Sequence, residues 1–383
     1  MIWRAAPRLE HLVIKPSLAC TANCPTCHSR RELHRELSRQ RLLTFRDWQD
    51  VLEDARDLGV WQLTISGGEP TLYPRLAEII RIGRSYGWLV RLNSNGDFAR
   101  EGYGARLVEA GLNVVDISLY SAIPALHDSM RARKGLWHRA TANIAMFAQL
   151  ADEHPPFKVM TQTILCRENY RDFGELVKLH HRLGSSGLLV SYLEGDFDGE
   201  HLLSAEEIQE FRSDILPAAL EVGQRLDNHT RELAISALTQ IFSPAVLDAE
   251  SCARGVYRQG DAPCSIPRKQ ALILANGDVH PCNIVEYTHD AVVGNLFSSR
   301  LRNVWNGDAW QQFRLCRHQR CSRCPMNHHV YVPLKATTRL RGAVTTVLNR
   351  LHFGQLDEKI HPAISRARTA AARTFGPRPD APS

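Results

Sequence analysis

The stretch Lys15-Pro-Ser-Leu-Ala-Cys-Thr-Ala-Asn-Cys-Pro-Thr-Cys-His28 directly follows an apolar run that predicts a β-strand. It places three cysteines, Cys20, Cys24 and Cys27, at C-x3-C-x2-C spacing. A [4Fe–4S] cluster normally takes four cysteine thiolates, so a loop that supplies three leaves one iron open to a small molecule. A structural zinc site, the alternative, is usually closed by four ligands in two separated pairs. The spacing therefore favours an iron–sulfur cluster with an open position.

A second motif follows about forty residues later in the segment Trp61-Gln-Leu-Thr-Ile-Ser-Gly-Gly-Glu-Pro70. It reads as a short apolar strand that runs into Gly67, Gly68, Glu69 and Pro70. Glycines let a backbone approach a ligand closely, and a carboxylate at such a place can hold an ammonium group. An ordinary turn at the end of a strand is the alternative for this motif taken alone.

The first 200 residues alternate strand-like and helix-like patterns, which predicts an α/β fold with a partial parallel (β/α)6 barrel. Catalytic sites of such barrels lie at the carboxyl ends of the strands, where the cysteine loop, Gly67–Pro70 and Ser94-Asn95-Gly96 all fall. Thr44 with Asp47 predicts a helix start with a capping box, and Ser204 predicts another helix start. The expected strands lie near 11–16, 61–66, 88–93, 112–118, 157–165 and 187–193, and the expected helices near 45–58, 75–86, 139–152 and 171–183.

Together these motifs resemble those of the radical S-adenosylmethionine (radical SAM) enzymes. The resemblance implies that the open iron binds the amino and carboxylate groups of SAM. It also implies that one electron cleaves SAM to methionine and a 5′-deoxyadenosyl radical, which abstracts a hydrogen atom from a substrate. In that family the residue before the third cysteine is usually aromatic, whereas here it is Thr26, with the ring of His28 as a substitute.

The same resemblance implies several SAM-binding residues. Ser118 ends the fourth expected strand, and Arg131 follows in His127-Asp-Ser-Met-Arg131. These two positions resemble those of the serine and the arginine that bind the SAM carboxylate or ribose in relatives. A solvated surface charge is the alternative for Arg131. Gln162 and Thr163 of the fifth strand are expected to face the adenosine. The predicted cofactor-binding set is Gly67, Gly68, Glu69, Pro70, Asn95, Ser118 and Arg131.

A further group of cysteines resembles the SPASM/twitch extension of radical SAM enzymes. Cys264-x12-Gly277-x4-Cys282 surrounds an expected hairpin with a turn at Asn276-Gly277, and Cys321-x2-Cys324 follows an aromatic helix expected over 304–313. The resemblance implies one auxiliary [4Fe–4S] cluster, and a structural zinc site is the alternative. The expected auxiliary ligands are Cys264, Cys282, Cys321 and Cys324.

Three cysteines remain. Cys166 is expected to behave as a small buried apolar residue. Cys316 lies five residues before Cys321 and can replace it as a ligand. Cys252 is expected near the barrel mouth, where it either donates a hydrogen atom to a substrate radical, as a thiol does in certain radical SAM epimerases, or serves as a fourth auxiliary ligand.

Composition and charge bound the location and the partners. The chain has 383 residues, no signal peptide and no apolar run near the ~20 residues that cross a bilayer, so we expect a cytoplasmic enzyme. Nine Lys or Arg and three Asp or Glu lie between Lys335 and Ser383, so the net charge of +6 resides in that tail. Nucleic acid and membrane partners are not expected. The predicted domains are a barrel (1–200), a helical linker (201–260), an auxiliary cluster domain (261–334) and a basic helix and tail (335–383).

The substrate is predicted from weaker signals. Up to four carboxylates follow the last strand, at Glu194, Asp196, Asp198 and Glu200, and can bind hydroxyl or ammonium groups. No segment before the first strand is expected to grasp a leader peptide. The cysteine motif resembles that of radical SAM enzymes of sugar- and nucleoside-antibiotic pathways, which implies epimerisation, oxidation or radical C–C coupling of a carbohydrate-, aminocyclitol- or nucleoside-type intermediate, with flavodoxin or ferredoxin as electron donor. The alternatives are maturation of a peptide or protein and, outside enzymes, an electron carrier or a zinc-stabilised binding module.

Overall fold

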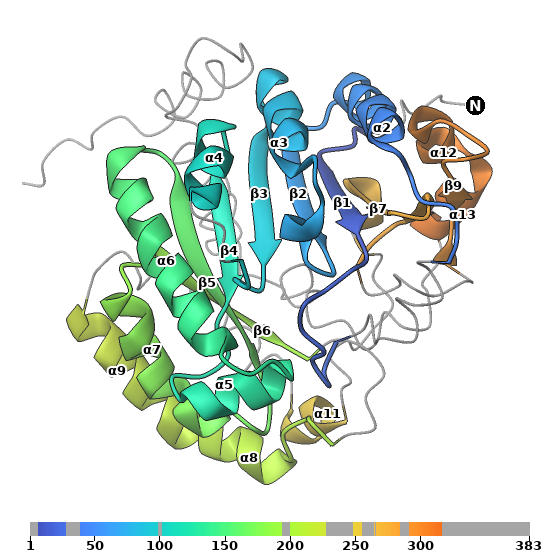
Figure 1. Cartoon of the computed structure of the whole chain (residues 1–383). Helices are drawn as coiled ribbons and strands as arrows, with labels where there is room; N and C mark the ends of the chain where they lie inside the picture. The colour runs from blue at the N-terminus through green and yellow to red at the C-terminus, as the bar shows by residue number, and fades with distance from the viewer. Residues whose placement is uncertain are drawn as a thin grey trace, which may run out of the picture. The chain divides into compact units, whose positions relative to one another are not determined.

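The computed structural model describes residues 7–27, 39–98, 102–193, 200–226, 248–254, 264, 266–283 and 291–315. Within them one nine-stranded sheet has the order β6-β5-β4-β3-β2-β1-β7-β8-β9 (Figure 1). Strands β1 to β6 are all parallel and pair in sequence order, which confirms the predicted α/β fold with six parallel strands. The strands are β1 (His11–Ser17), β2 (Gln62–Gly67), β3 (Leu89–Ser94), β4 (Val114–Ser118), β5 (Lys158–Leu165), β6 (Gly187–Tyr192), β7 (Gln270–Leu274), β8 (Asp278–His280) and β9 (Gly294–Asn295).

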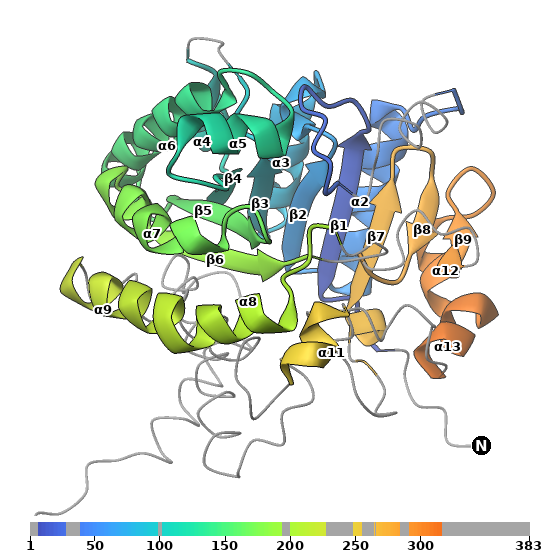
Figure 2. The same ribbon diagram turned by 90° about the horizontal axis from the view of Figure 1, so that it is seen from below.

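Helices follow the parallel strands and cover the outer face of the curved sheet (Figure 2). The four helices predicted in this region are present within a few residues of the expected bounds, whereas α4 and α5 were not predicted. The α-helices are α2 (Phe45–Leu58), α3 (Leu76–Ser85), α4 (Tyr103–Glu109), α5 (Pro124–Arg131), α6 (Leu136–Glu153), α7 (Phe173–Arg182), α8 (Ala205–Glu210), α9 (Leu216–Leu226), α11 (Ala249–Ala253), α12 (Leu301–Asn306) and α13 (Asp308–Leu315). The short elements are the 3-10 helices η1 (Pro70–Leu72), η2 (Tyr170–Asp172) and η4 (Ile266–Arg268), and the π-helix η3 (Phe211–Ile215).

Both predicted helix starts carry complete capping boxes. At the start of α2, the backbone N–H of Asp47 donates to the Thr44 hydroxyl (3.3 Å), and the Thr44 N–H donates to the Asp47 carboxylate (2.7 Å). Ser204 and Glu207 do the same at the start of α8. Each box satisfies two backbone donors that a helix start otherwise leaves without a partner.

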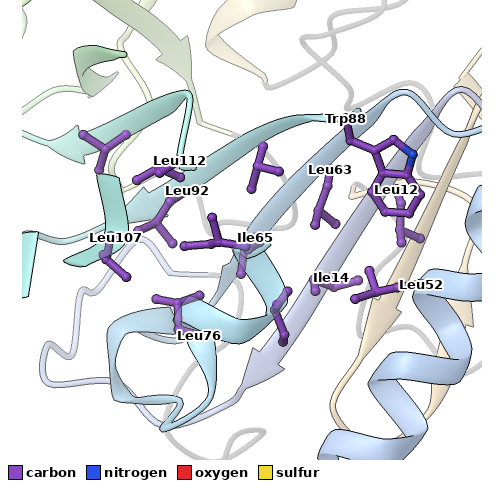
Figure 3. Packing of buried hydrophobic residues seen from close by; sticks show 14 of the residues in the cluster. Leu12, Ile14, Leu52, Leu63, Ile65, Leu76, Trp88, Leu92, Leu107 and Leu112 are labelled. Carbon is purple, nitrogen blue, oxygen red and sulfur yellow. The ribbon is translucent and has the colours of Figure 1, made fainter. Parts of the chain in front are cut away.

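The core lies between the sheet and its outer helices. Along β2, Leu63 and Ile65 are fully buried in this core, while Thr64 between them points to the opposite face. Figure 3 shows Leu63 and Ile65 packed with residues of β1 and β3 and with Leu52 of α2 and Leu76 of α3. The period-two pattern of the strands therefore fixes which face the helices cover.

The opposite, inner face of the sheet carries paired polar groups beside an apolar cluster of Val13, Leu272 and Leu274. Arg91 of β3 forms a two-pronged ion pair with the buried carboxylate of Asp116 on β4. His11 of β1 hydrogen-bonds Thr64 of β2 through its Nε2 atom (2.8 Å). Burial raises the pKa of Asp116, although the guanidinium of Arg91 opposes that rise. The barrel interior is thus lined with paired polar groups.

The C-terminal region continues the barrel sheet. Strand β7 pairs in parallel with β1, and β8 returns antiparallel through a turn at Gly277, whose φ of +82° suits glycine. The predicted hairpin is therefore confirmed, and its first strand extends the barrel. The four domain boundaries remain predictions, and residues 335–383 lie outside the described part of the chain.

The prediction of a single helix over 304–313 is wrong. The structure has two helices, α12 and α13, because Gly307 is extended (φ −73°, ψ 162°). Arg300 and Arg302, at the start of α12, both form ion pairs with Asp54 of α2, whose carboxylate is buried. Tertiary contacts with the barrel therefore fix where α12 begins.

No helix among the described residues is long and apolar enough to span a bilayer.

The buried histidine of α7 predicts an acid-dependent loss of stability. His180 hydrogen-bonds Thr161 (2.8 Å), and burial lowers its pKa from 6.5 to about 4. The unfolded chain therefore binds a proton below pH 6.5 that the folded chain refuses until about pH 4. As the pH falls from 6.5 to about 4, we expect the unfolding free energy of the wild type to fall by about 3 kcal/mol relative to that of His180→Asn. Urea titrations at several pH values measure this difference, and His138→Asn, at an exposed position of α6, is the control. Equal pH dependence of wild type and His180→Asn would contradict the prediction.

Candidate functional site

The candidate site lies at the carboxyl ends of β1 to β4, as the sequence predicted. The cysteine loop leaves β1 after Ser17 and holds Cys20, Cys24 and Cys27 as free, half-buried thiols. The backbone N–H of Ala22 donates to the sulfur of Cys20 (3.4 Å). Burial raises the pKa of Cys20 to about 11, so this thiol needs a nearby positive charge or a metal to ionise.

The donor set of the loop fits an iron–sulfur cluster. Three thiols on one loop, with an N–H donor at one sulfur, are the ligands and the supporting hydrogen bonds that such clusters use. In the part of the chain that the structure describes, no three ligand side chains converge on a single metal ion.

Gly67, the last residue of β2, and Gly68 after it allow the end of that strand to contact the cysteine loop. A Cβ atom on Gly68 would lie 2.3 Å from the carbonyl oxygen of Ala19, and one on Gly67 would lie 2.4 Å from that of Ser17. Backbone hydrogen bonds join the same segments, from Gly68 N to Ser17 O (3.0 Å) and from Glu69 N to Ala19 O (2.7 Å). Glycine is therefore required at these two positions because two backbone segments of this chain approach closely. The sequence predicts the approach of a ligand instead.

The carboxylate of Glu69 is fully buried and accepts four hydrogen bonds from this chain. Its donors are the backbone N–H groups of Asn95 (2.7 Å) and Thr71 (3.1 Å) and the hydroxyls of Thr71 (2.7 Å) and Ser94 (2.9 Å). Burial raises its pKa against the effect of these donors. Glu69 therefore joins the end of β2 to the end of β3, and its Oε2 atom accepts only the bond from Asn95 among the described residues, which leaves an acceptor site for the ammonium group that the sequence suggests.

Asn95, just after β3, contacts the cysteine loop directly. Its side-chain amide donates to the hydroxyl of Thr21 (3.0 Å) and lies 3.7 Å from the sulfur of Cys20. Asp97, two residues later, pairs with Arg133 and Arg139. The loop after β3 thus fixes one side of the cysteine loop.

Ser118 and Arg131 bound the site on the β4 side. Ser118 is the half-buried last residue of β4 and is in register with Gln162 of β5. Arg131 ends α5 and is buried, so the alternative of a solvated surface charge is wrong. Its carbonyl oxygen accepts a hydrogen bond from the N–H of Asn23 in the cysteine loop (3.1 Å).

Only one of the two β5 residues expected to face the adenosine can do so. Thr161 and Thr163 are both fully buried on the helix-covered face, where Thr161 contacts His180 and Thr163 contacts Asn169. Gln162 lies between them and points to the inner face. The alternation of side chains along β5 decides which residue faces inward, and the sequence alone does not fix where that alternation starts.

The auxiliary ligands are described in part. Cys264 and Cys282 are half-buried, and the sulfur of Cys264 accepts a hydrogen bond from Ile266 N (3.4 Å). Helix α13 holds the Cys264 segment, because Trp310 and Arg314 both donate to the carbonyl oxygen of Pro267 (2.8 and 3.3 Å). Cys316, Cys321 and Cys324 lie outside the described residues.

The other candidate residues have mixed outcomes. Cys166 is fully buried at the end of β5, as expected of a small apolar residue. Cys252 belongs to the short helix α11, but its side chain is outside the described part. Of the four expected carboxylates, Glu194, Asp196 and Asp198 fall outside the described ranges, and Glu200 is exposed.

Comparisons with known proteins agree with this geometry. Residues 14–180 match the radical SAM superfamily, and residues 264–325 match the SPASM iron–sulfur cluster-binding domain. The PqqA peptide cyclase of Streptomyces rochei is 25% identical over 328 residues, which cover 83% of this chain and 82% of that protein. The PqqA peptide cyclase of Gluconobacter oxydans is 24% identical over 75% of this chain and 74% of that protein.

Two solved structures share the fold. Streptococcus suis SuiB bound to S-adenosylmethionine has a TM-score of 0.62 at 18% identity and covers 82% of this chain and 69% of its own. The enzyme anSMEcpe with bound AdoMet and a Cp18Cys peptide has a TM-score of 0.56 at 15% identity, over 83% of this chain and 86% of its own.

Proposed function

We propose that this chain, a radical SAM enzyme with a C-terminal SPASM domain, modifies a peptide or protein substrate. The observation that carries the proposal is the alignment with a PqqA peptide cyclase over 82% of that relative, which spans both regions. SuiB, which shares the fold with a TM-score of 0.62, has also been solved with its precursor peptide SuiA. These relatives do not support the expected sugar- or nucleoside-type substrate or the link to antibiotic pathways. They favour the alternative prediction, maturation of a peptide or protein.

Three thiolates of the loop would hold a [4Fe–4S] cluster, which with bound SAM supplies the 5′-deoxyadenosyl radical. The chain's own residues provide the frame for this chemistry. Asn95 and the end of β2 hold the cysteine loop at the mouth of the barrel. The proposed SAM-binding set remains Gly67, Gly68, Glu69, Pro70, Asn95, Ser118 and Arg131, and Glu69 in addition joins two strand ends.

The C-terminal region would hold a second cluster. Cys264, Cys282, Cys321 and Cys324 are its proposed ligands, and α13 fixes the first of them through Pro267. An auxiliary cluster near the barrel suits a reaction that removes an electron from a substrate radical. Under that reaction a thiol donor at Cys252 is unnecessary, whereas epimerisation of a peptide residue would require one.

An anaerobic activity assay tests the proposed substrate class. Short open reading frames beside the gene are made as synthetic peptides and incubated with reconstituted enzyme, SAM and a flavodoxin reducing system. We expect one peptide to raise 5′-deoxyadenosine formation at least tenfold and to change in mass or stereochemistry. Cys24→Ala is the inactive control, and a panel of nucleotide sugars and nucleosides is the competing substrate set. Stimulation by a member of that panel, with every peptide unchanged, would overturn the proposal.

A further inference from the structure

The buried side chain of Asn95 presents a fixed end of its amide to the cysteine loop. The residue is 4% exposed, and its Oδ1 atom accepts a hydrogen bond from the backbone N–H of Asp97 (2.7 Å). The other end, Nδ2, carries two hydrogens and faces two acceptors, the Thr21 hydroxyl (3.0 Å) and the sulfur of Cys20 (3.7 Å). Because an N–H donor must meet the amide oxygen, the network decides which end faces Cys20, and that end is a donor.

The turn that carries Asn95 is held from two sides. The backbone N–H of Asn95 donates to the buried carboxylate of Glu69 (2.7 Å). The side chain of Asn143 on α6 donates to the carbonyl oxygens of Gly96 (2.9 Å) and Phe98 (2.8 Å). A dipole that is fixed in this way stabilises charge that appears beside it without first having to reorient.

The atom that Asn95 faces is one of the three proposed cluster ligands. The sulfur of Cys20 also accepts a hydrogen bond from the backbone N–H of Ala22 (3.4 Å). Hydrogen bonds are stronger when the acceptor is ionised, as a ligating thiolate is. Reduction adds one negative charge to a cluster and its sulfur ligands, and hydrogen bonds to these sulfurs are among the factors that set the potential. A donor at Cys20 therefore favours the reduced state.

We propose that Asn95 is a positioning residue whose side-chain amide donates to the Cys20 sulfur and raises the reduction potential of the cluster on this loop. The proposal rests on the proposed function, since it requires that cluster. It differs from the binding of SAM, the role that the sequence analysis gave to Asn95. A residue that only binds SAM changes the affinity for SAM and leaves the potential of the SAM-free cluster unchanged, so this potential separates the two roles.

The test uses the full chain, reconstituted anaerobically, as wild type, Asn95→Asp, Asn95→Ala and Thr21→Val. Asn95→Asp keeps the shape of the side chain and presents an oxygen to Cys20 in place of Nδ2. Thr21→Val removes the other acceptor of the same amide and leaves the Cys20 contact, so it is the matched control. Midpoint potentials are measured without SAM by redox titration followed by electron paramagnetic resonance. The wild-type signal that shifts on later addition of SAM identifies the relevant cluster.

We expect Asn95→Asp to disfavour the reduced cluster at least tenfold, which lowers the midpoint by 59 mV or more for one electron. Asn95→Ala loses the donor without gaining a charge and should disfavour the reduced cluster by about threefold or more. Thr21→Val should stay within about twofold of wild type, because the amide still donates to Cys20.

A measurement on wild type decides the question if the Asn95 variants load no iron. Protein labelled with ¹⁵N at the side-chain amides of asparagine is reduced without SAM and studied by pulsed electron paramagnetic resonance. We expect a ¹⁵N coupling to the cluster, carried through the hydrogen bond to Cys20. The coupling should persist in Asn23→Ser, which removes the other asparagine of the cysteine loop. A missing coupling in wild type, or its loss in Asn23→Ser, would overturn the inference.

Three results of the titrations would overturn this inference and leave the proposed function intact. The first is an equal potential of wild type and both Asn95 variants, with or without weaker SAM binding. The second is a shift in Asn95→Asp alone, because the added charge then accounts for it. The third is a shift in Thr21→Val as large as that in Asn95→Asp, because attachment of the loop then sets the potential. A wild-type protein that loads no cluster on Cys20, Cys24 and Cys27 would overturn both proposals together.

Discussion

We expect the Cys24→Ala protein to form no detectable 5′-deoxyadenosine from SAM under reducing conditions. The three thiolates of one loop leave a single iron open for SAM, so loss of any of them removes the cluster or its geometry. Cys20→Ala and Cys27→Ala should behave in the same way. The iron content should fall by about four atoms per chain while auxiliary iron is retained, because the two sites use separate ligands. Chromatography of the nucleoside and iron and sulfide counts measure these effects.

Cys166→Ala is the matched control for these substitutions. Cys166 is a fully buried free thiol directly after β5, in an apolar cluster with Leu165 and Tyr170. We expect this variant to retain full iron content and SAM cleavage, with only the modest loss of stability of a small cavity. Retained 5′-deoxyadenosine formation in Cys24→Ala would rule out the assignment of the loop.

The second large effect is expected for Gly68→Ala. The added methyl would lie 2.3 Å from the carbonyl oxygen of Ala19 and 2.6 Å from that of Leu18, so the cysteine loop has to move away from β2. We expect SAM cleavage to fall about 100-fold, since a shift of about 1 Å in a catalytic group has effects of this size. The unfolding free energy should fall by about 1–3 kcal/mol, as for other overpacked sites. Initial rates, iron counts and urea titrations measure the three quantities.

Gly174→Ala provides the control for the glycine substitution. Gly174 lies in α7, and a methyl there would meet no atom within 4 Å. Because alanine favours the helix over glycine, this variant should be as active as wild type and up to about 1 kcal/mol more stable. If Gly68→Ala cleaves SAM at the wild-type rate, the close contact between β2 and the cysteine loop is not needed for activity.

The sequence by itself determined the features that depend on local pattern. Strand and helix spans follow from apolar periodicity within about ten residues, and the capping boxes at Thr44 and Ser204 follow from residues three positions apart. The C-x3-C-x2-C spacing is equally local, and it predicted the region of the site and the superfamily. The relatives favour the peptide alternative over the sugar-type substrate that was the main prediction, because these motifs bind the cofactor and carry no information on the substrate.

Tertiary structure alone decided how the site is held together. The four donors to Glu69 come from η1 and from the end of β3. The parallel partner of β7 is β1, more than 250 residues away, and the carbonyl oxygen of Arg131 contacts a loop more than 100 residues before it. Gly307 splits an expected helix where Arg300 and Arg302 dock on Asp54. Such contacts join segments that are far apart in the chain, and their energies depend on burial and on the approach of specific atoms. A local pattern carries neither quantity, so only the folded chain shows that Arg131 is buried and that its carbonyl oxygen contacts the cysteine loop.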